Sequence, residues 1–190
     1  MVSPALCFEG CLAKYSQHRP FCLHAVLSYF MSHPLFVHND YRYSPAMAGD
    51  FLEIAALDRE IWKGVPYGEV IPDGEHAWRI WCEHALLYTA RDASGLLAGA
   101  ILAFPGVKGE ACVHKVMVAK EHQGRGVGSL LFALLLEEID RQKVQCFLTV
   151  SPGNPAAIAL YRKLGFMKEQ FVAGFYRESE DRLVMTRPAV

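Results

Sequence analysis

A glycine-rich turn between an apolar strand and a long apolar helix constrains this fold more than any other feature of the chain. Every second residue of the turn, 123–128 (QGRGVG), is glycine. The run before it, 111–119, is strand-like, and the leucines after it recur at helical spacing to about Gln142. Backbone N–H groups in such a turn, together with the start of the helix, form an anion site. The spacing is neither that of a P-loop nor the complete GxGxxG of dinucleotide-binding folds.

A second motif lies in the segment 154–165, NPAAIALYRKLG, which predicts a helix that Gly165 ends. Asn154, Ala157 and Tyr161 are spaced i, i+3 and i+7, so they share one helical face. The small residue between two hydrogen-bonding side chains leaves space for a thin, amide-bearing ligand. Considered alone, Tyr161 is by default a core tyrosine with a solvated hydroxyl. We expect Leu160 to turn towards the core.

The remaining segments read as further strands and helices. We expect strands at 35–43, 86–90, 96–104, 111–119, 146–150, 167–177 and 181–187. We expect helices at 45–63, from a cap at Asp73 to about 85, from the glycine turn to 142, and at 154–165. The segment 63–74 reads as a loop. This order implies an α/β (α+β) domain with a mixed sheet and helices on both faces.

The composition argues against several classes of protein. The chain has 19 Lys and Arg against 20 Asp and Glu, so it lacks the basic surplus of a nucleic-acid binder. Its six cysteines form no CxxC pair, which argues against zinc and against a disulfide scaffold. We therefore expect reduced thiols and a cytoplasmic protein. The uncharged stretch 20–39 is interrupted by histidines, serines and Pro34, so we expect no membrane insertion.

Together, the two motifs resemble those of the GNAT acetyltransferase superfamily. The segment from Val118 through 123–128 resembles its coenzyme A loop, Q/R-x-x-G-x-G/A. The segment 154–166 resembles its second signature, N-x-x-A-x-x-L-Y-x-x-x-G-F. The pattern is most similar to that of ribosomal-protein and other protein N-terminal alanine acetyltransferases. The resemblance implies a mostly antiparallel, twisted sheet of six to seven strands in a domain at 35–190, after a leader at 1–34.

The resemblance also implies acetyl-CoA as co-substrate, no metal, and a primary amine as acceptor that attacks directly in a ternary complex. Tyr161 would give a proton to the departing thiolate, since an ordinary tyrosine, with a pKa of about 10, stays protonated at neutral pH. The residues that it implies for coenzyme A binding are Val116, Met117, Val118, Gln123, Gly124, Arg125, Gly126, Val127, Gly128, Ser129, Asn154, Ala157 and Tyr161.

The general base is left open by the sequence. Similar N-terminal acetyltransferases carry glutamate where this chain has Thr149, and many other members carry an acid near Lys115. The remaining candidates are His114, whose residue type titrates near neutrality, Glu110 at a strand start, and His76. The missing acids also motivate the alternative that the chain is a non-catalytic acyl-CoA sensor.

The acceptor is equally open. The tail 174–186 resembles the last hairpin of protein N-terminal acetyltransferases, which favours a protein α-amine or a lysine, with small amines as the other class. Aromatic residues that could wall the acceptor side are Trp62, Tyr67, Trp78 and Trp81. A homodimer is a further possibility that the sequence leaves undecided.

Overall fold

A computed structural model describes residues 36–63 and 72–190 of the chain. The predicted leader at 1–34, and most of the predicted loop at 63–74, lie outside the described residues. Among the described helices, none combines the length and the apolar character needed to cross a bilayer.

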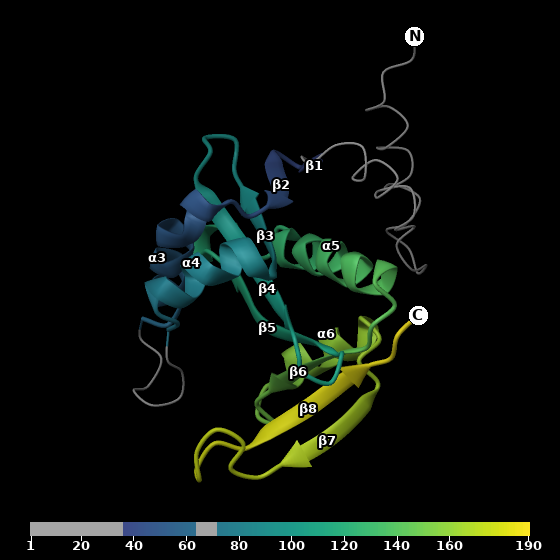
Figure 1. Ribbon diagram of the computed structural model, residues 1–190. Helices are drawn as coiled ribbons and strands as arrows, with labels where there is room; N and C mark the ends of the chain where they lie inside the picture. The colour runs from purple at the N-terminus through teal and green to yellow at the C-terminus, as the bar shows by residue number, and fades with distance from the viewer. Residues whose placement is uncertain (1–35, 64–71) are drawn as a thin grey trace. The chain divides into compact units, whose positions relative to one another are not determined.

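The described residues form one eight-stranded sheet in the order β1-β2-β3-β4-β5-β6-β8-β7 (Figure 1). The strands are β1 (Phe36–His38), β2 (Tyr41–Pro45), β3 (Leu86–Arg91), β4 (Leu97–Pro105), β5 (Ala111–Val118), β6 (Cys146–Val150), β7 (Lys168–Val172) and β8 (Arg182–Arg187). The helices are η1 (Ala48–Asp50), α3 (Phe51–Ile61), α4 (Glu75–His84), η2 (Lys120–His122), α5 (Val127–Arg141) and α6 (Pro155–Lys163). All strand pairs are antiparallel except β5 and β6. The predicted mixed, mostly antiparallel sheet is confirmed.

The described sheet has eight strands, slightly more than the six to seven predicted, because the described part of the segment 35–43 is a hairpin and not one strand. Asn39 and Asp40 have φ values of 46° and 65°, and His38 pairs directly with Tyr41. A two-residue turn with positive φ at both positions joins antiparallel strands tightly, and Asn and Asp tolerate that conformation. The next residues extend β2 to Pro45, so the helix predicted from 45 begins only at Phe51, after η1.

Two other boundaries differ from the predictions. The N-cap of α4 is Gly74 and not Asp73, whose carboxylate makes contacts described below. The predicted strand at 167–177 ends at Val172, and the residues after it form the connection to β8. The end of α6 is as predicted: Gly165 has a φ of 92° and the Phe166 N–H donates to the Tyr161 carbonyl, 3.0 Å away.

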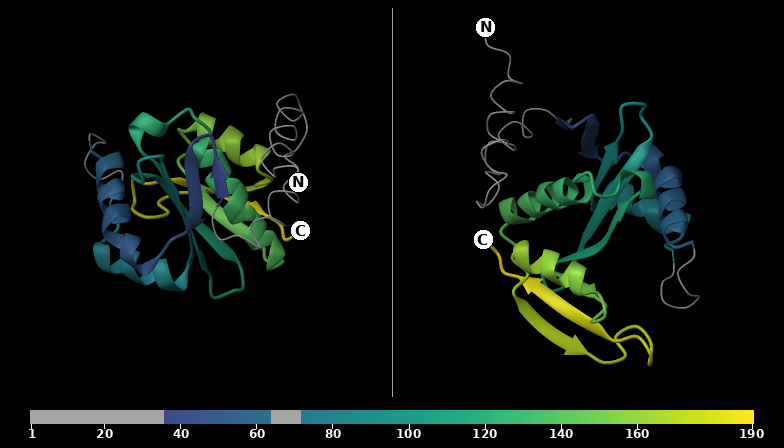
Figure 2. Two further views of the ribbon diagram at one scale, coloured as in Figure 1. Left: turned by 90° about the horizontal axis from the view of Figure 1, so that it is seen from above. Right: turned by 180° about the vertical axis from the view of Figure 1, so that it is seen from behind.

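Helices cover both faces of the sheet, as predicted. Figures 1 and 2 show α3 and α4 on one face of β3–β5 and α5 on the other. The core between the sheet and the layer of α3 and α4 contains three fully buried residues, Ile54, Trp78 and Leu102. On the other face of the sheet, Leu131 and Ile139 of α5 are equally buried. This burial of apolar surface on both faces holds the central strands in place.

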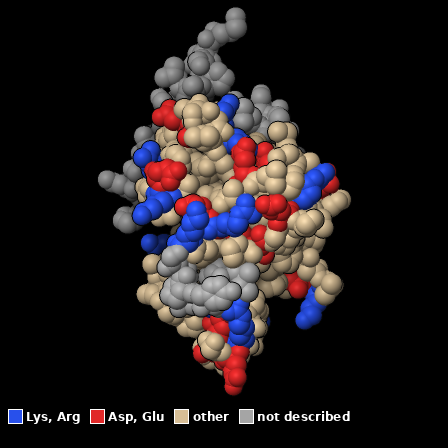
Figure 3. Space-filling view, turned by 90° about the vertical axis from the view of Figure 1, so that its left-hand side faces the viewer, with Lys and Arg blue, Asp and Glu red and all other residues tan. Residues whose placement is uncertain are grey.

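The outer face of α3 and α4 carries interleaved charges (Figure 3). Arg59 of α3 pairs with Glu75 of α4 at 3.0 Å, and Lys63 pairs with Glu60. The Arg59–Glu75 pair links the two helices at their surface, in addition to the core beneath them.

The sheet opens between its two parallel strands. β5 and β6 pair only at Ala111–Cys146 and Cys112–Phe147. Beyond these pairs the strands diverge, and β6, β7 and β8 form an arm that leads away from β5 (Figures 1 and 2). One edge of β5 from Val113 onwards therefore has no strand beside it within the described residues.

A β-bulge at His114 changes which side chains of β5 face α3 and α4. Leu102 of β4 pairs with Lys115 and the next residue, Ala103, pairs with Val113, so His114 is an extra residue in β5. An extra residue shifts the alternation of a strand between its two faces. As a result, the neighbouring side chains of His114 and Lys115 both lie on the α3/α4 face.

Candidate active site

A groove of about 560 Å³ lies where the glycine-rich turn meets the free edge of β5. Nine of the residues predicted to bind coenzyme A line it: Val116, Met117, Val118, Gln123, Gly124, Gly126, Val127, Gly128 and Ser129. The other lining residues are Ile61, His122, Phe132 and Leu160. The structure therefore gathers the strand, the turn and the start of α5 around one space.

The turn needs glycine for its backbone conformation. Gly124 and Gly126 have φ values of 73° and 82°, which other residues rarely adopt, and a Cβ at either position would meet no atom within 4 Å. Gly128 differs, since a Cβ there would lie 3.3 Å from the Val118 side chain. Any side chain at Gly124 or Gly126 would project into open space at the groove.

The N-terminus of α5 presents unpaired donors to this groove. The first backbone hydrogen bond into the helix runs from the Leu130 N–H to the Gly126 carbonyl, 3.1 Å away, and no side chain caps the helix. The N–H groups of Val127, Gly128 and Ser129 precede that bond. Unpaired N–H groups and the helix dipole favour a negative charge at this point. The residues present thus fit the pyrophosphate of coenzyme A.

The free edge of β5 supplies further backbone groups. The Ala119 N–H donates to the Ala98 carbonyl of β4, so the backbone groups of Ala119 face β4. Because successive residues of a strand point their backbone groups to opposite sides, those of Val116 and Val118 face the open edge. The Gln123 side chain donates to the Val118 carbonyl at 3.1 Å, which uses one of these groups. The remaining groups fit an extended, amide-bearing chain laid alongside β5.

Four of the residues predicted to bind coenzyme A do not line this groove. Arg125 lines a second groove of about 580 Å³, which shares His122 with the first. Asn154 is the N-cap of α6, and its side-chain oxygen accepts from the Ala157 N–H at 3.0 Å. Helix capping therefore accounts for that oxygen and leaves only the Asn154 amide nitrogen for a ligand. The four residues are therefore Arg125, Asn154, Ala157 and Tyr161.

Tyr161 lies against the wall of the groove. Its ring packs on Phe132, a lining residue, with 5.7 Å between ring centroids, and on Phe166 at 6.1 Å. Within residues 36–63 and 72–190, no group hydrogen-bonds its hydroxyl. Burial raises the pKa of Tyr161 above its ordinary value, so the hydroxyl keeps its proton at neutral pH. Leu160, predicted to face the core, is 39% exposed and lines the groove instead.

A buried ion network lies on the other side of β5, beneath α3 and α4. The Lys115 Nζ donates to both oxygens of Asp58, at 2.9 and 3.0 Å, and to Asp73 Oδ2 at 2.5 Å. Asp58 is fully buried and also accepts from the indole N–H groups of Trp62, at 2.8 Å, and Trp78, at 3.2 Å. The carboxylates of Asp58 and Asp73 are thus held by one ammonium group and several N–H donors.

His114 joins this network through Asp73. Its Nε2 lies 3.1 Å from Asp73 Oδ2, and its ring lies 5.4 Å from those of both Trp81 and Phe104. Burial alone would raise the pKa of Asp73, but the hydrogen bonds from His114 and Lys115 outweigh it and lower the pKa. Asp73 therefore remains a carboxylate at neutral pH.

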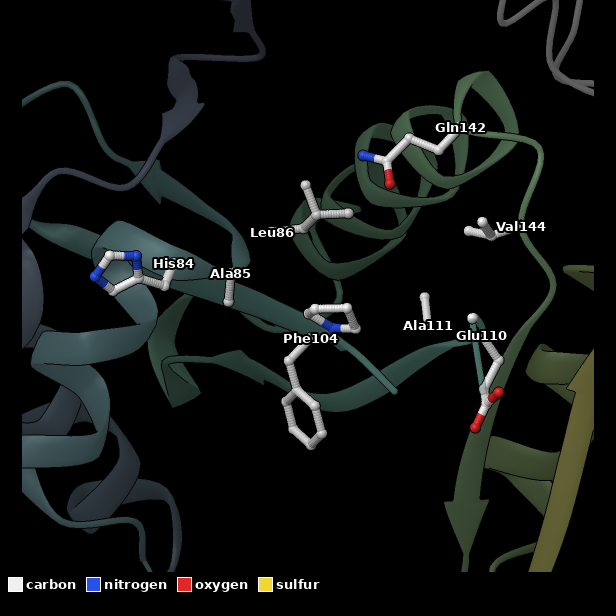
Figure 4. Close-up of a pocket in the computed structure, with 10 residues that line it drawn as sticks. His84, Ala85, Leu86, Phe104, Glu110, Ala111, Gln142 and Val144 are labelled. Carbon is white, nitrogen blue, oxygen red and sulfur yellow. The ribbon is translucent and has the colours of Figure 1, made fainter. Parts of the chain in front are cut away.

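The structure does not bring Glu110 or His76 to the groove. Glu110 immediately precedes β5 and lines a separate pocket of about 330 Å³, across from His84 (Figure 4). It precedes Val116 by six residues, or about 20 Å along an extended strand. His76 is exposed on α4. His114 does not line the groove either, but only two residues, about 7 Å, separate it from Val116, which does.

Comparison with known proteins identifies the family to which this architecture belongs. The model of the acetyltransferase (GNAT) family matches residues 52–166, more than half of the chain. The chain belongs to the GNAT family. The match includes α3, α4, the groove and α6, so the resemblance inferred from the two motifs is confirmed.

This chain spans about half the length of the two curated relatives described first. An N-alpha-acetyltransferase of Saccharolobus solfataricus is 30% identical over 44% of this chain and 52% of its own. A [ribosomal protein bS18]-alanine N-acetyltransferase of Salmonella typhimurium is 35% identical over 42% of this chain and 56% of its own. The crystal structure of nourseothricin acetyltransferase is 26% identical, with a TM-score of 0.62, over 80% of this chain and all of that one.

Thr149 is the position at which the resemblance implied a glutamate in similar N-terminal acetyltransferases. Its hydroxyl lies 2.9 Å from that of Tyr176, in the connection between β7 and β8. Arg182 lies over the Tyr176 ring, 5.2 Å from its centroid. This position therefore holds a neutral hydrogen-bonded pair and no acid.

The sequence analysis missed Asp58 and Asp73 as members of the site. One signal was available for Asp58, because it falls among the apolar residues that repeat along α3 at Ile54, Leu57 and Ile61. A carboxylate on the core face of a helix needs a buried partner. Tyr67, predicted near the acceptor, lies outside the described residues, and Trp78 is a core residue with 0% exposure.

Proposed function

We propose that this GNAT protein is an acetyl-CoA-dependent N-acetyltransferase that moves an acetyl group to a primary amine. One observation carries the proposal: the unpaired edge of β5 and the N-terminus of α5, which has no side-chain cap among the described residues, line the same groove. That arrangement suits a ligand with an extended amide-bearing arm and a pyrophosphate at its end. When bound, acetyl-CoA supplies an activated acetyl thioester.

The chain's own residues then have distinct tasks. The turn and the first N–H groups of α5 hold the pyrophosphate, and backbone groups of Val116 and Val118 pair with the arm. A backbone N–H at this edge, that of Val118 or a neighbour, polarises the thioester carbonyl. Tyr161, with its unpartnered hydroxyl against the groove wall, is the general acid.

The proposed acetyl transfer uses one general base and one general acid. The amine nitrogen forms a bond to the acetyl carbonyl carbon, and the carbon–sulfur bond breaks with its electron pair on sulfur. The amine proton goes to His114, and the hydroxyl proton of Tyr161 goes to the thiolate. The products are an N-acetyl amine and coenzyme A.

The acceptor that we favour is a protein or peptide amine. The relatives from Saccharolobus and Salmonella are named for α-amine and alanine acetylation, which supports this class. Tyr176, held by Thr149 in the connection before β8, offers a side chain that could frame a peptide. Assay of thiol release against a panel of N-terminal peptides, lysine peptides and small amines tests both the activity and the acceptor class. The absence of release with every amine, despite binding of acetyl-CoA, would favour a non-catalytic sensor.

Tyr161→Phe tests the general acid. We expect kcat to fall roughly 10–10³-fold, because the variant keeps the ring contacts with Phe132 and Phe166 but loses the proton for the thiolate. The dissociation constant of acetyl-CoA should change by less than about threefold, or roughly 0.7 kcal/mol. Steady-state turnover and direct titration of the donor measure the two effects separately.

Tyr88→Phe is the matched control for Tyr161→Phe. Burial raises the pKa of Tyr88 to about 12, so this variant also removes a partly buried hydroxyl, but from β3. It should leave kcat unchanged. Full turnover in Tyr161→Phe would remove this residue from the mechanism, and a loss of affinity without a loss of kcat would make it a binding residue only.

A further inference from the structure

The ion network includes a histidine whose two ring nitrogens differ in their surroundings. His114 Nε2 lies 3.1 Å from Asp73 Oδ2. Among the described residues, nothing hydrogen-bonds Nδ1. A carboxylate that accepts from Nε2–H selects the tautomer with a lone pair on Nδ1. That nitrogen can then accept a proton.

Asp73 is itself held in place from two sides. Lys115 Nζ donates to the same oxygen, Oδ2, and the Asp73 backbone N–H donates to Asp58 Oδ2 at 2.7 Å. Both contacts tie the segment before α4 to α3 and β5. The carboxylate is therefore fixed in charge and in direction, although Asp73 itself belongs to no helix or strand.

The ion network adjoins the groove along the chain. As the extra residue of β5, His114 shares the α3/α4 face with Lys115, whereas Val116, two residues on, lines the groove. Ile61 lines the same groove and precedes Trp62, which donates to Asp58. The network and the groove are thus adjacent along two separate elements.

We propose that Asp73 is the positioning residue of the general base, fixing the His114 tautomer so that Nδ1 takes the proton of the acceptor amine. The proposal rests on the proposed N-acetyltransferase function. The charged groups that face His114 are Asp73 from the segment before α4, Lys115 from β5 and, through Lys115, Asp58 from α3. Trp81 of α4 and Phe104 of β4, which pack on the ring, carry no charge.

Asp73→Asn in the full-length protein tests the proposal. We expect kcat to fall about 10–100-fold, with the acetyl-CoA dissociation constant within about threefold of its original value. The acidic limb of the kcat/KM profile should move to lower pH, because the imidazolium loses its anionic partner while Lys115 remains nearby. In the His114→Gln background the same substitution should have no further effect on kcat.

A nitrogen NMR measurement on the free protein gives a readout that does not depend on turnover. The imidazole signals of His114, assigned by their loss in His114→Gln, should show a proton on Nε2 and none on Nδ1 at high pH. Asp73→Asn should reduce this tautomer preference. If the unsubstituted protein shows this tautomer preference but transfers no acetyl group to any amine, the proposed function is refuted. The positioning of His114 by Asp73 would still stand.

Asp140→Asn is the matched control. The side chains of Asp73 and Asp140 are both 24% exposed, and Asp140 pairs with Arg187 of β8 as Asp73 pairs with Lys115. This control should leave the pH profile and the tautomer of His114 unchanged, whatever it does to stability. Either of two results overturns the positioning role. The first is an unchanged His114 tautomer in Asp73→Asn. The second is a double variant whose loss of kcat equals the product of the losses in Asp73→Asn and His114→Gln.

Discussion

Gly126→Asp should weaken coenzyme A binding by about three orders of magnitude while leaving the fold intact. In the proposed mode of binding, the new carboxylate at the N-cap of α5 would lie beside the pyrophosphate, since Gly126 lines the groove. Two anions about 4 Å apart repel each other by about 4 kcal/mol near a protein surface, which corresponds to roughly 10³-fold in affinity. Calorimetric titration with coenzyme A measures the loss, and circular dichroism checks the fold.

Gly109→Asp controls for backbone strain in that experiment. Gly109 has a φ of 81°, close to the 82° of Gly126, and a Cβ there would likewise meet nothing within 4 Å. It lies in the turn between β4 and β5, at the opposite end of β5 from the groove. Gly109→Asp should bind coenzyme A normally. Unchanged affinity in folded Gly126→Asp would show that the donor binds elsewhere.

Lys115→Met should lower the free energy of unfolding by about 3–5 kcal/mol. Asp58, with 0% side-chain exposure, would keep its buried charge but lose the ammonium group 2.9 Å away. Removal of one partner from a buried ion pair typically costs this much, because the remaining charge is uncompensated. Urea denaturation followed by tryptophan fluorescence measures the change, since Trp62 and Trp78 both donate to Asp58.

Two further variants separate charge from packing in this experiment. Adding Asp58→Asn to Lys115→Met should recover part of the lost stability, because no buried charge remains. Lys63→Met removes an exposed lysine that pairs with Glu60, and it should have little effect. If the double variant is less stable than Lys115→Met alone, packing of the lysine chain and not its charge is the dominant contribution.

Local patterns were sufficient to predict most of this fold. The glycine turn, α5 and α6 follow from residues close in sequence: positive φ at Gly124 and Gly126, apolar periodicity along α5, and Gly165 at the end of α6. Such features depend on conformational preferences that each segment carries with it. The coenzyme A groove could be predicted for the same reason, because a strand, a turn and a helix that are consecutive in the chain form most of it.

Contacts between distant segments could not be predicted in the same way. The sequence contains Asp58, Asp73 and Lys115 as three ordinary charged residues, and only the packing of α3 and α4 on β5 brings them together. Lys115 was therefore interpreted as a missing acid, although it holds two carboxylates in place. The β1–β2 hairpin was missed for a different reason. Its turn, Asn39–Asp40, lies in a run whose aromatic and β-branched residues favour a strand throughout.

The bulge at His114 makes the two halves of β5 independent in evolution. Residues after it, Val116 to Val118, keep the edge that fits the donor, whereas residues at and before it determine what faces α3 and α4. Substitutions at His114 can therefore alter the proton-transfer group without altering the register of the donor half. Deleting His114 would remove the bulge but leave Val113 and Lys115 on their present faces, because they already pair with adjacent residues of β4. The side chain that β5 presents at this point can therefore change, or be lost, without moving the residues that line the groove.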